Sequence, residues 1–296
     1  MTFRPRRSAL FMPGSNTRAL EKARTLDCDV VILDLEDAVA PDQKVQARAN
    51  VLEAVRCGGF GQREVVIRIN GMATPWHHDD LAAAIAAAPD AILLPKIESP
   101  LDLAAVGKAL AARGADPRTR LWAMIETPLA VLNVSAIAEA AARTPASRLA
   151  CLVLGTNDLA KQCRAAQTPS RGPMLFALSA AVLAARAYGI DVLDGVYNDF
   201  RDPGGLRREA LQGSELGMDG KTLIHPSQIA IANEIFAPSA DEIAAAHAIV
   251  AAFDKPENSG KGVISLDGRM VELLHLEIAR QTLARAGTVS GRGSIS

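Results

Sequence analysis

The sequence predicts a (β/α)8 barrel, an α/β fold, followed by a helical extension at the C-terminus. Eight short apolar runs alternate with helical periodicity over about 225 residues, near the usual size of such a barrel. Polar residues follow several of these runs, where a barrel holds its active site. A doubly wound sheet is the alternative, but it favours a glycine fingerprint after the first strand. Residues 12–17 contain one glycine, so we favour the barrel.

We expect strands where short apolar runs, many of them rich in β-branched residues, lie between turn signals. The second run, Val30–Leu33, has the continuous apolar character of a strand covered on both faces. The expected strands are 8–12, Val30–Leu33, Val65–Ile69, Ala91–Leu94, Leu121–Ile125, Leu149–Leu154, Asp191–Val196 and Lys221–Ile224.

Helix-start signals follow these strands. Ser99 with Pro100, and Thr127 with Pro128, place a cap and a proline where a helix begins. Ser239 and Glu242 form a capping-box pattern. We expect the barrel in residues 1–236, and a C-terminal helical extension or lid with a flexible tail in residues 237–296.

Three further segments complete the expectation for the extension. Residues 255–262 are expected to form a linker, and Met270–Leu283 a last amphipathic helix. Residues 287–296 are expected to form a frayed tail.

Composition indicates a globular cytoplasmic protein. The 296 residues are 49% hydrophobic and 22% charged, with a net charge of −1, which gives no reason to expect nucleic-acid binding. The apolar patch near the N-terminus is too short for a membrane span or a signal-peptide core. The four cysteines form no C-x-x-C pair and are expected to be reduced thiols: Cys28, Cys57, Cys151 and Cys163.

Carboxylates gather at the ends of the expected strands. Glu36 and Asp37 follow the second strand, Glu126 follows the fifth and Asp158 follows the sixth. Carboxylates on neighbouring strands suit Mg²⁺, so we expect Glu126 and Asp158 to be direct ligands. Glu36 and Asp37 would orient metal-bound water without contacting the metal themselves. The alternative is that these acids cap the helices that follow them.

Three basic side chains lie at the same strand ends. Arg68 suits a substrate carboxylate or carbonyl, although a salt bridge to Glu36 or Asp37 is equally compatible. Lys96 is assigned a structural or electrostatic role, because a Schiff-base lysine needs an apolar pocket rather than a ring of acids. His225 precedes Pro226 and is interpreted as a cap or core residue rather than a base.

These residues lie within motifs that resemble the HpcH/HpaI aldolase and citrate lyase β-subunit-like family, of the malyl-CoA and citramalyl-CoA lyase type. The similar segments cover nearly the whole chain in order. They are RRSALFMPGSN at 6–16, LDLEDAVAPD at 33–42, RING at 68–71, LPKIES at 94–99, IETPLAV at 125–131, LGTNDLA at 154–160, DGVYNDF at 194–200 and GMDGKTLIHPSQI at 217–229.

The resemblance implies a barrel that uses Mg²⁺ and acyl-CoA substrates. It implies homo-oligomers, trimers or hexamers, in which the C-terminal extension packs over a neighbouring subunit. Glu272 stands where lyases of this family have a catalytic aspartate supplied in trans. The resemblance implies these roles by position: Glu126 and Asp158 as metal ligands, Arg68, Glu126, Gly155, Thr156 and Asn157 as substrate-binding, and Phe11, Met12 and Lys22 as CoA-binding.

The function expected from these observations is a Mg²⁺-dependent carbon–carbon lyase that cleaves a malyl-CoA, methylmalyl-CoA or citramalyl-CoA type of substrate. Arg68 and Glu272 would be its catalytic residues. Hydrolysis by a malyl-CoA thioesterase with the same kind of site is the alternative. A citrate lyase β-subunit acting on a citryl thioester, and a metal-free scaffold, are further alternatives. No membrane or nucleic-acid partner is expected.

Overall fold

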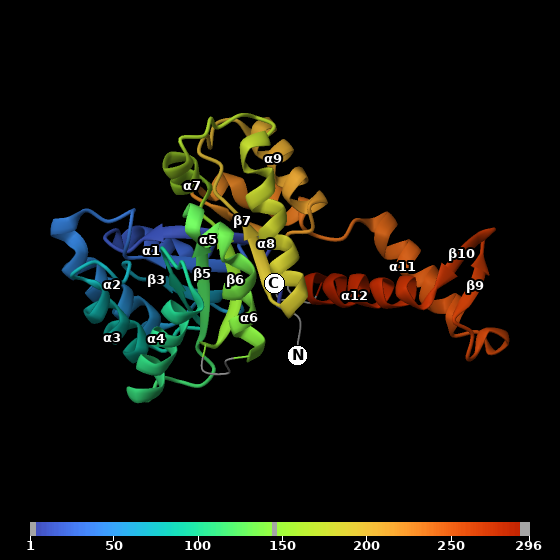
Figure 1. Ribbon diagram of the computed structural model, residues 1–296, viewed down its shortest axis with the longest axis horizontal. Coiled ribbons are helices and arrows are strands. Elements are labelled where there is room, and N and C mark those ends of the chain that lie inside the picture. Colours follow the sequence, from blue (N-terminus) through green and yellow to red (C-terminus); the bar gives the residue numbers. More distant parts are fainter. Residues whose placement is uncertain (1–3, 144–146, 291–296) are drawn as a thin grey trace. The chain divides into compact units, whose positions relative to one another are not determined.

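The computed structural model describes residues 4–143 and 147–290 of the chain. They form two compact units: Arg6–Asn233, and the described residues of Met1–Pro5 with those of Glu234–Ser296. In the first unit, eight parallel strands pair in chain order and close where the first pairs with the eighth. The predicted barrel is confirmed (Figure 1).

Each predicted strand is present, with bounds that differ by no more than two residues at an end. The strands are β1 (Ser8–Pro13), β2 (Val30–Asp34), β3 (Glu64–Arg68), β4 (Ala91–Leu94), β5 (Arg120–Ile125), β6 (Leu149–Leu154), β7 (Asp191–Asp194) and β8 (Gly220–Leu223).

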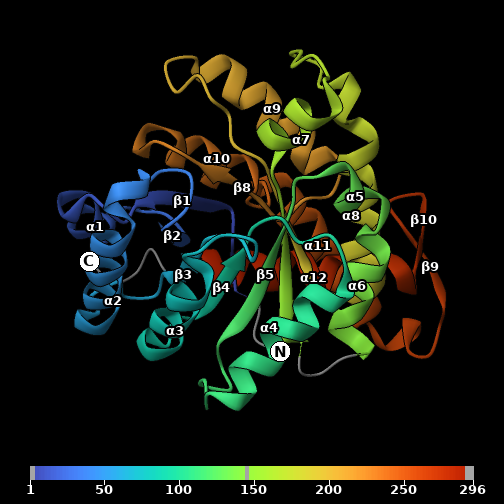
Figure 2. The ribbon, with the colours of Figure 1, turned by 60° about the vertical axis from the view of Figure 1, so that its left-hand side comes forward.

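Helices connect the strands and lie outside them (Figure 2). Ser99 and Asp102 form a capping box at one helix start, and the Thr127 hydroxyl accepts the Ala130 N–H at another. The helices are α1 (Thr17–Ala23), α2 (Lys44–Cys57), α3 (His77–Ala87), α4 (Pro100–Ala112), α5 (Pro128–Leu132), α6 (Val134–Arg143), α7 (Thr156–Cys163), α8 (Leu175–Tyr188), α9 (Pro203–Glu215) and α10 (Ile229–Ile235), with 3₁₀ turns η1 (Pro41–Gln43), η3 (Gly172–Met174) and η4 (Pro226–Gln228).

The barrel interior is packed by alternate residues of strands β1 to β7. Val30 and Ile32 of β2 belong to this core together with Val66 of β3. Because side chains alternate along a strand, Asp34 and Arg68 continue the same inward rows, and they are paired in register. Trp122 and Met124 of β5 belong to the same core. The next alternate position is Glu126, so its side chain also faces inward. The fold therefore places charged side chains at the carboxyl end of an apolar core.

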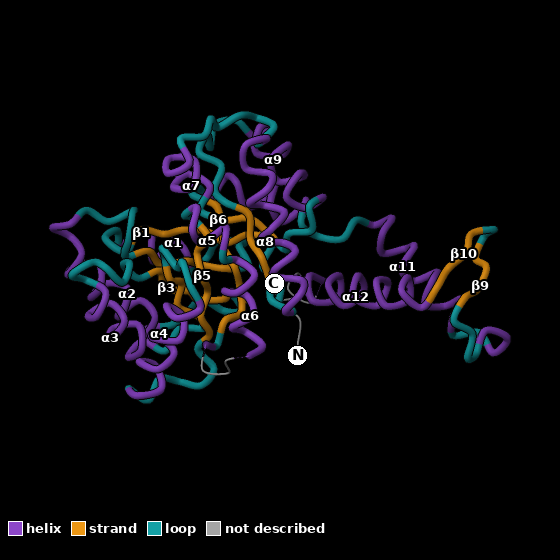
Figure 3. Tube along the Cα trace, in the orientation of Figure 1, coloured by secondary structure: helices purple, strands orange, loops and turns teal. Residues whose placement is uncertain are grey.

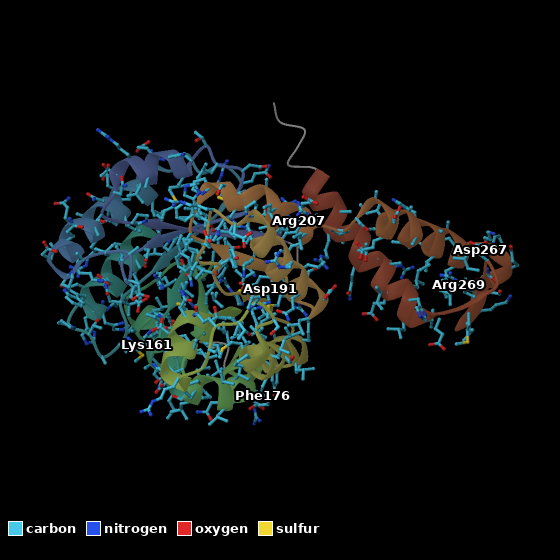
Figure 4. All side chains as sticks on the ribbon, turned by 90° about the horizontal axis from the view of Figure 1, so that it is seen from above. Lys161, Phe176, Asp191, Arg207, Asp267 and Arg269 are labelled. Carbon is cyan, nitrogen blue, oxygen red and sulfur yellow. The ribbon has the colours of Figure 1, made fainter. Side chains whose placement is uncertain are left out.

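The second unit contains a β-hairpin that the sequence analysis missed. Strands β9 (Val263–Leu266) and β10 (Arg269–Glu272) are antiparallel, between α11 (Ala240–Phe253) and α12 (Leu273–Ser290) (Figure 3). Asp267 and Gly268 form the turn with φ of 49° and 76°, which a two-residue hairpin turn of type I′ requires. Figure 4 labels Asp267 and Arg269 at this turn.

The expectations for the extension are corrected accordingly. The last helix begins at Leu273 rather than Met270, because residues 269–272 pair with β9. The expected linker contains a 3₁₀ turn, η5 (Pro256–Asn258). Helix α12 continues to Ser290, past the expected start of the tail, and residues 291–296 lie outside the described residues.

Residues 226–253 are apolar and long enough to cross a membrane by length and composition alone. The stretch is divided, because α10 has 7 residues and ends at Ile235, and α11 has 14 residues and begins at Ala240. A membrane span needs about 20 continuous helical residues, so this is weak evidence for one.

Removing a core side chain of the barrel should cost more stability than removing an exposed one. Leu93 of β4 is fully buried in the interior, so Leu93→Ala should lower the free energy of unfolding by about 2–5 kcal/mol. Leu101 of α4 is 78% exposed, and Leu101→Ala should change it by no more than about 0.5 kcal/mol. Urea denaturation measures both values, and equal effects would contradict the packing described.

Candidate active site

A cavity of about 300 Å³ lies at the carboxyl ends of the strands and is called the rim cavity below. Its walls come from the ends of β1, β2, β3 and β5 and from the loops after β6, β7 and β8. Its lining residues include Phe11, Asp34, Asp37, Arg68, Met124, Glu126, Gly155, Thr156, Asn157, Asp158 and Asn198. A second cavity of about 340 Å³ shares Thr156, Asn157 and Asn198 with it.

Arg68 is fixed at the mouth of the barrel by Asp34. Its Nε and Nη2 donate to the two carboxylate oxygens of Asp34 at 2.7 and 2.6 Å. Its guanidinium lies over the Phe11 ring, 4.5 Å from the ring centroid. Burial lowers the pKa of Arg68, but the acids around it outweigh burial and raise the pKa above its usual value. Arg68 therefore stays charged, with its remaining donor, Nη1, turned away from Asp34.

Glu36 is a buried acid next to Arg68. Its Oε2 lies 2.9 Å from Arg68 Nη1, which is ion-pair distance, but without the alignment of a hydrogen bond. Burial raises the pKa of Glu36 to about 8, because the nearby acids add to the desolvation and Arg68 offsets it only in part. Asp37 is more exposed, 3.5 Å from the same Nη1. The predicted salt bridge to Arg68 is present with both acids.

The loop that carries Glu36 is held by a buried lysine. Lys44 Nζ donates to the carbonyl oxygens of Leu35 and Glu36 and to Asn70 Oδ1, each at 2.8 Å. Asn70 in turn donates to the Leu35 carbonyl. This network fixes the backbone of the acidic loop independently of its carboxylates.

Glu126 and Asp158 meet at a single cation, the ammonium of Lys96. Lys96 Nζ lies 3.3 Å from Glu126 Oε1 and 3.2 Å from Asp158 Oδ1. Glu126 is fully buried, whereas the Asp158 side chain is 31% exposed. Burial raises the pKa of Glu126, although Lys96 opposes it. Burial lowers the pKa of Lys96, but Glu126, Glu36 and Asp158 outweigh it and raise that pKa.

A divalent ion fits the chemistry of this pair. Glu126 Oε2 is buried and has no hydrogen-bond partner among the described residues, so a carboxylate oxygen remains free to bind a cation. Within the described part of the chain, no group of three His, Cys, Asp or Glu side chains is arranged to hold a metal ion. Mg²⁺ is commonly held by one or two carboxylates, with water and substrate as its other ligands, so two are sufficient.

The loop after β6 packs directly on Glu126. A Cβ at Gly155 would overlap the Glu126 Cβ and come within 2.6 Å of its Oε2. Gly155 is also the N-cap residue of α7, and Asp158 lies in the first turn of that helix. Absence of a side chain at position 155 thus lets the two carboxylates approach each other.

Asn157 forms a reciprocal amide pair with Asn198 from the loop after β7. The side-chain nitrogen of each donates to the side-chain oxygen of the other, at 2.9 and 2.8 Å. Gln167 also donates to Asn157 Oδ1. Asn157 is among the site residues predicted from the sequence, whereas Asn198 is not, although it belongs to the strand-end motif DGVYNDF.

Some predicted site residues lie elsewhere. Phe11 lines the rim cavity, whereas Met12 is buried on the other face of β1, and Lys22 is an exposed residue of α1; neither is among the described residues of the cavity wall. Glu272 ends β10 in the second unit. Their roles stay predictions. His225 caps η4 by accepting the Ser227 N–H, as expected.

This fold and site define a class of protein. It consists of parallel-barrel enzymes with paired carboxylates and a buried arginine at the carboxyl-end rim. The HpcH/HpaI aldolase/citrate lyase family model matches residues 7–226. The chain belongs to this family of enzymes.

Relatives of known activity match the chain over almost its full length. Two proteins from strains of Cereibacter sphaeroides named (3S)-malyl-CoA thioesterase are 46% and 48% identical, over 98% and 97% of this chain and 98% and 96% of theirs. An L-malyl-CoA/beta-methylmalyl-CoA lyase of the same species is 35% identical over 97% of this chain and 96% of its own.

Solved structures of the family are also similar. CitE from Mycobacterium tuberculosis, in complex with magnesium, acetoacetate and coenzyme A, is 30% identical. It superimposes with a TM-score of 0.77 over 96% of this chain and 98% of its own.

These comparisons correct the expected activity. The main expectation was a carbon–carbon lyase, but the thioesterases are more similar to this chain than the lyases are. The motifs of the strand-end rim led to the error. A lyase and a thioesterase of one family can share a metal site and an arginine, so those motifs do not separate the two reactions.

The raised pKa of Glu36 predicts a pH-dependent loss of stability. Below pH 4.5 the carboxyl is protonated in both the folded and the unfolded chain. Between pH 4.5 and about 8 the unfolded chain releases this proton first, so folding becomes less favourable as pH rises. Without added metal, Glu36→Gln should therefore raise the melting temperature at pH 8 and have little effect near pH 4.5.

Asp37→Asn is the matched control, because it removes the same charge from an exposed neighbour. Thermal unfolding across this pH range makes the comparison. A Glu36→Gln protein that is less stable than wild type at pH 8 would show that attraction to Arg68 outweighs burial.

Proposed function

We propose that the protein is a Mg²⁺-dependent thioesterase that hydrolyses (3S)-malyl-CoA or a closely similar 3-hydroxyacyl-CoA. The observation that carries this proposal is the 46–48% identity to (3S)-malyl-CoA thioesterases over nearly the whole length of both chains. The reaction replaces the carbon–sulfur bond of the thioester with a carbon–oxygen bond from water. The products are free malate and the CoA thiol, which takes up a proton.

Glu126 and Asp158 are the residues that we propose to hold the metal. Support comes from their convergence on one cation, the unpartnered Oε2 of Glu126, and the magnesium in the complex of the related CitE. Bound there, Mg²⁺ would polarise oxygens of the acyl group and stabilise negative charge that develops on them.

Arg68 is proposed to bind an oxygen of the acyl group. Asp34 holds two of its nitrogens and Phe11 supports one face, so the guanidinium is positioned before substrate arrives. Such preorganisation avoids the cost of ordering a flexible side chain during the reaction. Glu36 lies beside the same guanidinium, 2.9 Å from its Nη1.

The rim cavity and the cavity that adjoins it are proposed to hold the acyl group and part of the thioester arm. Asn157 and Asn198 line both, and their amide groups can hydrogen-bond a polar ligand that passes between the cavities. We further propose a cytoplasmic homo-oligomer, a trimer or hexamer, in which Glu272 reaches the site of a neighbouring subunit.

Product analysis tests the proposed reaction. Incubation with (3S)-malyl-CoA and Mg²⁺ should release malate and CoA in equal amounts, without glyoxylate. Chelation of Mg²⁺, or Glu126→Gln, should lower the rate by about 100-fold or more, because the metal contributes several kcal/mol to transition-state stabilisation. Formation of acetyl-CoA and glyoxylate in place of malate would overturn the proposal.

Gly155→Ala should weaken the metal site without unfolding the protein. The added methyl overlaps Glu126 and must displace its carboxylate, so the Kd for Mg²⁺ should rise about 10–100-fold. Gly71→Ala is the matched control, since its Cβ would make only ordinary contacts, 3.8 Å from Lys96 Cγ. Titration calorimetry measures both, and unchanged affinity in Gly155→Ala would exclude Glu126 as a ligand.

A further inference from the structure

We propose that Lys96 is an internal counter-cation, which holds Glu126 and Asp158 together in the metal-free protein and moves aside when a divalent ion binds. The inference concerns a positioning residue and rests on the Mg²⁺ site of the proposed function. It assigns Lys96 a role that differs from both a Schiff-base nucleophile and a simple surface lysine.

The position of the ammonium is the first observation. Lys96 Nζ lies within 3.3 Å of one oxygen from each carboxylate, so it occupies the point on which the two acids converge. Glu126 is fully buried, and an unpaired buried charge would be costly. A divalent ion bound by the same two carboxylates would lie close to the ammonium and bear the same sign of charge, so the two cations would repel each other.

The backbone of Lys96 supplies a second, independent observation. Its φ is 55°, in the left-handed region that costs energy for any residue other than glycine. Its N–H donates to Glu126 Oε1 at 2.8 Å. Both the main-chain N–H and the side-chain ammonium of Lys96 thus contact Glu126. The left-handed backbone conformation positions them for these contacts.

The ammonium has room to leave. The Lys96 side chain is 37% exposed, whereas Glu126 is fully buried, so the lysine can swing into solvent and the carboxylate cannot. Contact with Glu126 remains after such a movement, because the N–H of Lys96 does not depend on the side chain. The exchange therefore replaces one cation with another and leaves the carboxylates in place.

Competition predicts the direction of the effect of removing the ammonium. Lys96→Met removes the competing charge and keeps much of the aliphatic chain. The Kd for Mg²⁺ should then fall about tenfold, equivalent to about 1.4 kcal/mol. If Lys96 instead supported the bound metal, the same substitution would weaken binding, so the sign of the change separates the two roles.

The experiment is titration calorimetry with MgCl₂ on the full chain, together with thermal unfolding in EDTA and in saturating Mg²⁺. Lys96→Met should have a lower melting temperature than wild type in EDTA, and Mg²⁺ should raise its melting temperature by more. Lys96→Gln provides a second uncharged variant in case the first does not fold. Lys96→Arg keeps the charge and should bind Mg²⁺ no more tightly than wild type.

Lys161→Met is the matched control. Lys161 is an exposed residue of the same helix that carries Asp158, and it is labelled in Figure 4. The Lys161→Met variant tests whether loss of any nearby positive charge tightens Mg²⁺ binding. Its Kd for Mg²⁺ should stay within about twofold of the wild-type value, because exposed charges are screened.

The outcomes separate this inference from the proposed function. Wild-type protein that releases malate in a Mg²⁺-dependent reaction, with Lys96→Met binding Mg²⁺ equally or less tightly, overturns the role of Lys96 alone. Absence of Mg²⁺ binding in wild type and in both uncharged variants overturns the metal site together with this role. Hydrolysis itself is decided by the malate assay.

Discussion

The buried ion pair between Asp34 and Arg68 is the interaction on which the site depends. Inward alternation on β2 and β3 places these two charges in the mouth of an apolar barrel, in register with each other. Removing a charge from water costs several kcal/mol unless a partner with good geometry compensates it. Asp34 meets this requirement by accepting two guanidinium bonds and the N–H groups of Glu36 and Ala38. Arg68 is thereby fixed, and the acidic loop after β2 is folded around the same carboxylate.

Compensation is less complete for two other acids of the rim, Glu36 and Glu126. Glu36 and Glu126 each keep a buried carboxylate oxygen that no described residue hydrogen-bonds. Burial raises the pKa of both carboxyls, which shows that their charged forms are not fully stabilised by the protein alone. A cation brought by a ligand or cofactor would supply the missing stabilisation. Perturbed pKa values of this kind are typical of functional sites.

Much of this could be predicted from the sequence, because periodicity and strand-end chemistry are local signals. The eight strands and the convergence of Glu126 and Asp158 follow from them. The β9–β10 hairpin is also signalled, by Asp267–Gly268 within the run 264–271, but the predicted elements leave residues 263–269 unassigned and begin a helix at Met270. Other features depend on contacts between distant segments. The left-handed turn that directs Lys96 to Glu126, and the pairing of Asn157 with Asn198 across 41 positions of sequence, are specified only once the barrel is closed.

The reaction is harder to predict from the sequence than the fold is. Lysis of malyl-CoA breaks a carbon–carbon bond and leaves the thioester intact, whereas hydrolysis breaks the carbon–sulfur bond and keeps the carbon skeleton. Both need a polarised acyl group held by its oxygens, which is the role proposed for Arg68 and for a metal ion bound by Glu126 and Asp158. These residues therefore cannot decide between the reactions. The deciding groups must be those that meet the thioester carbonyl and the attacking water.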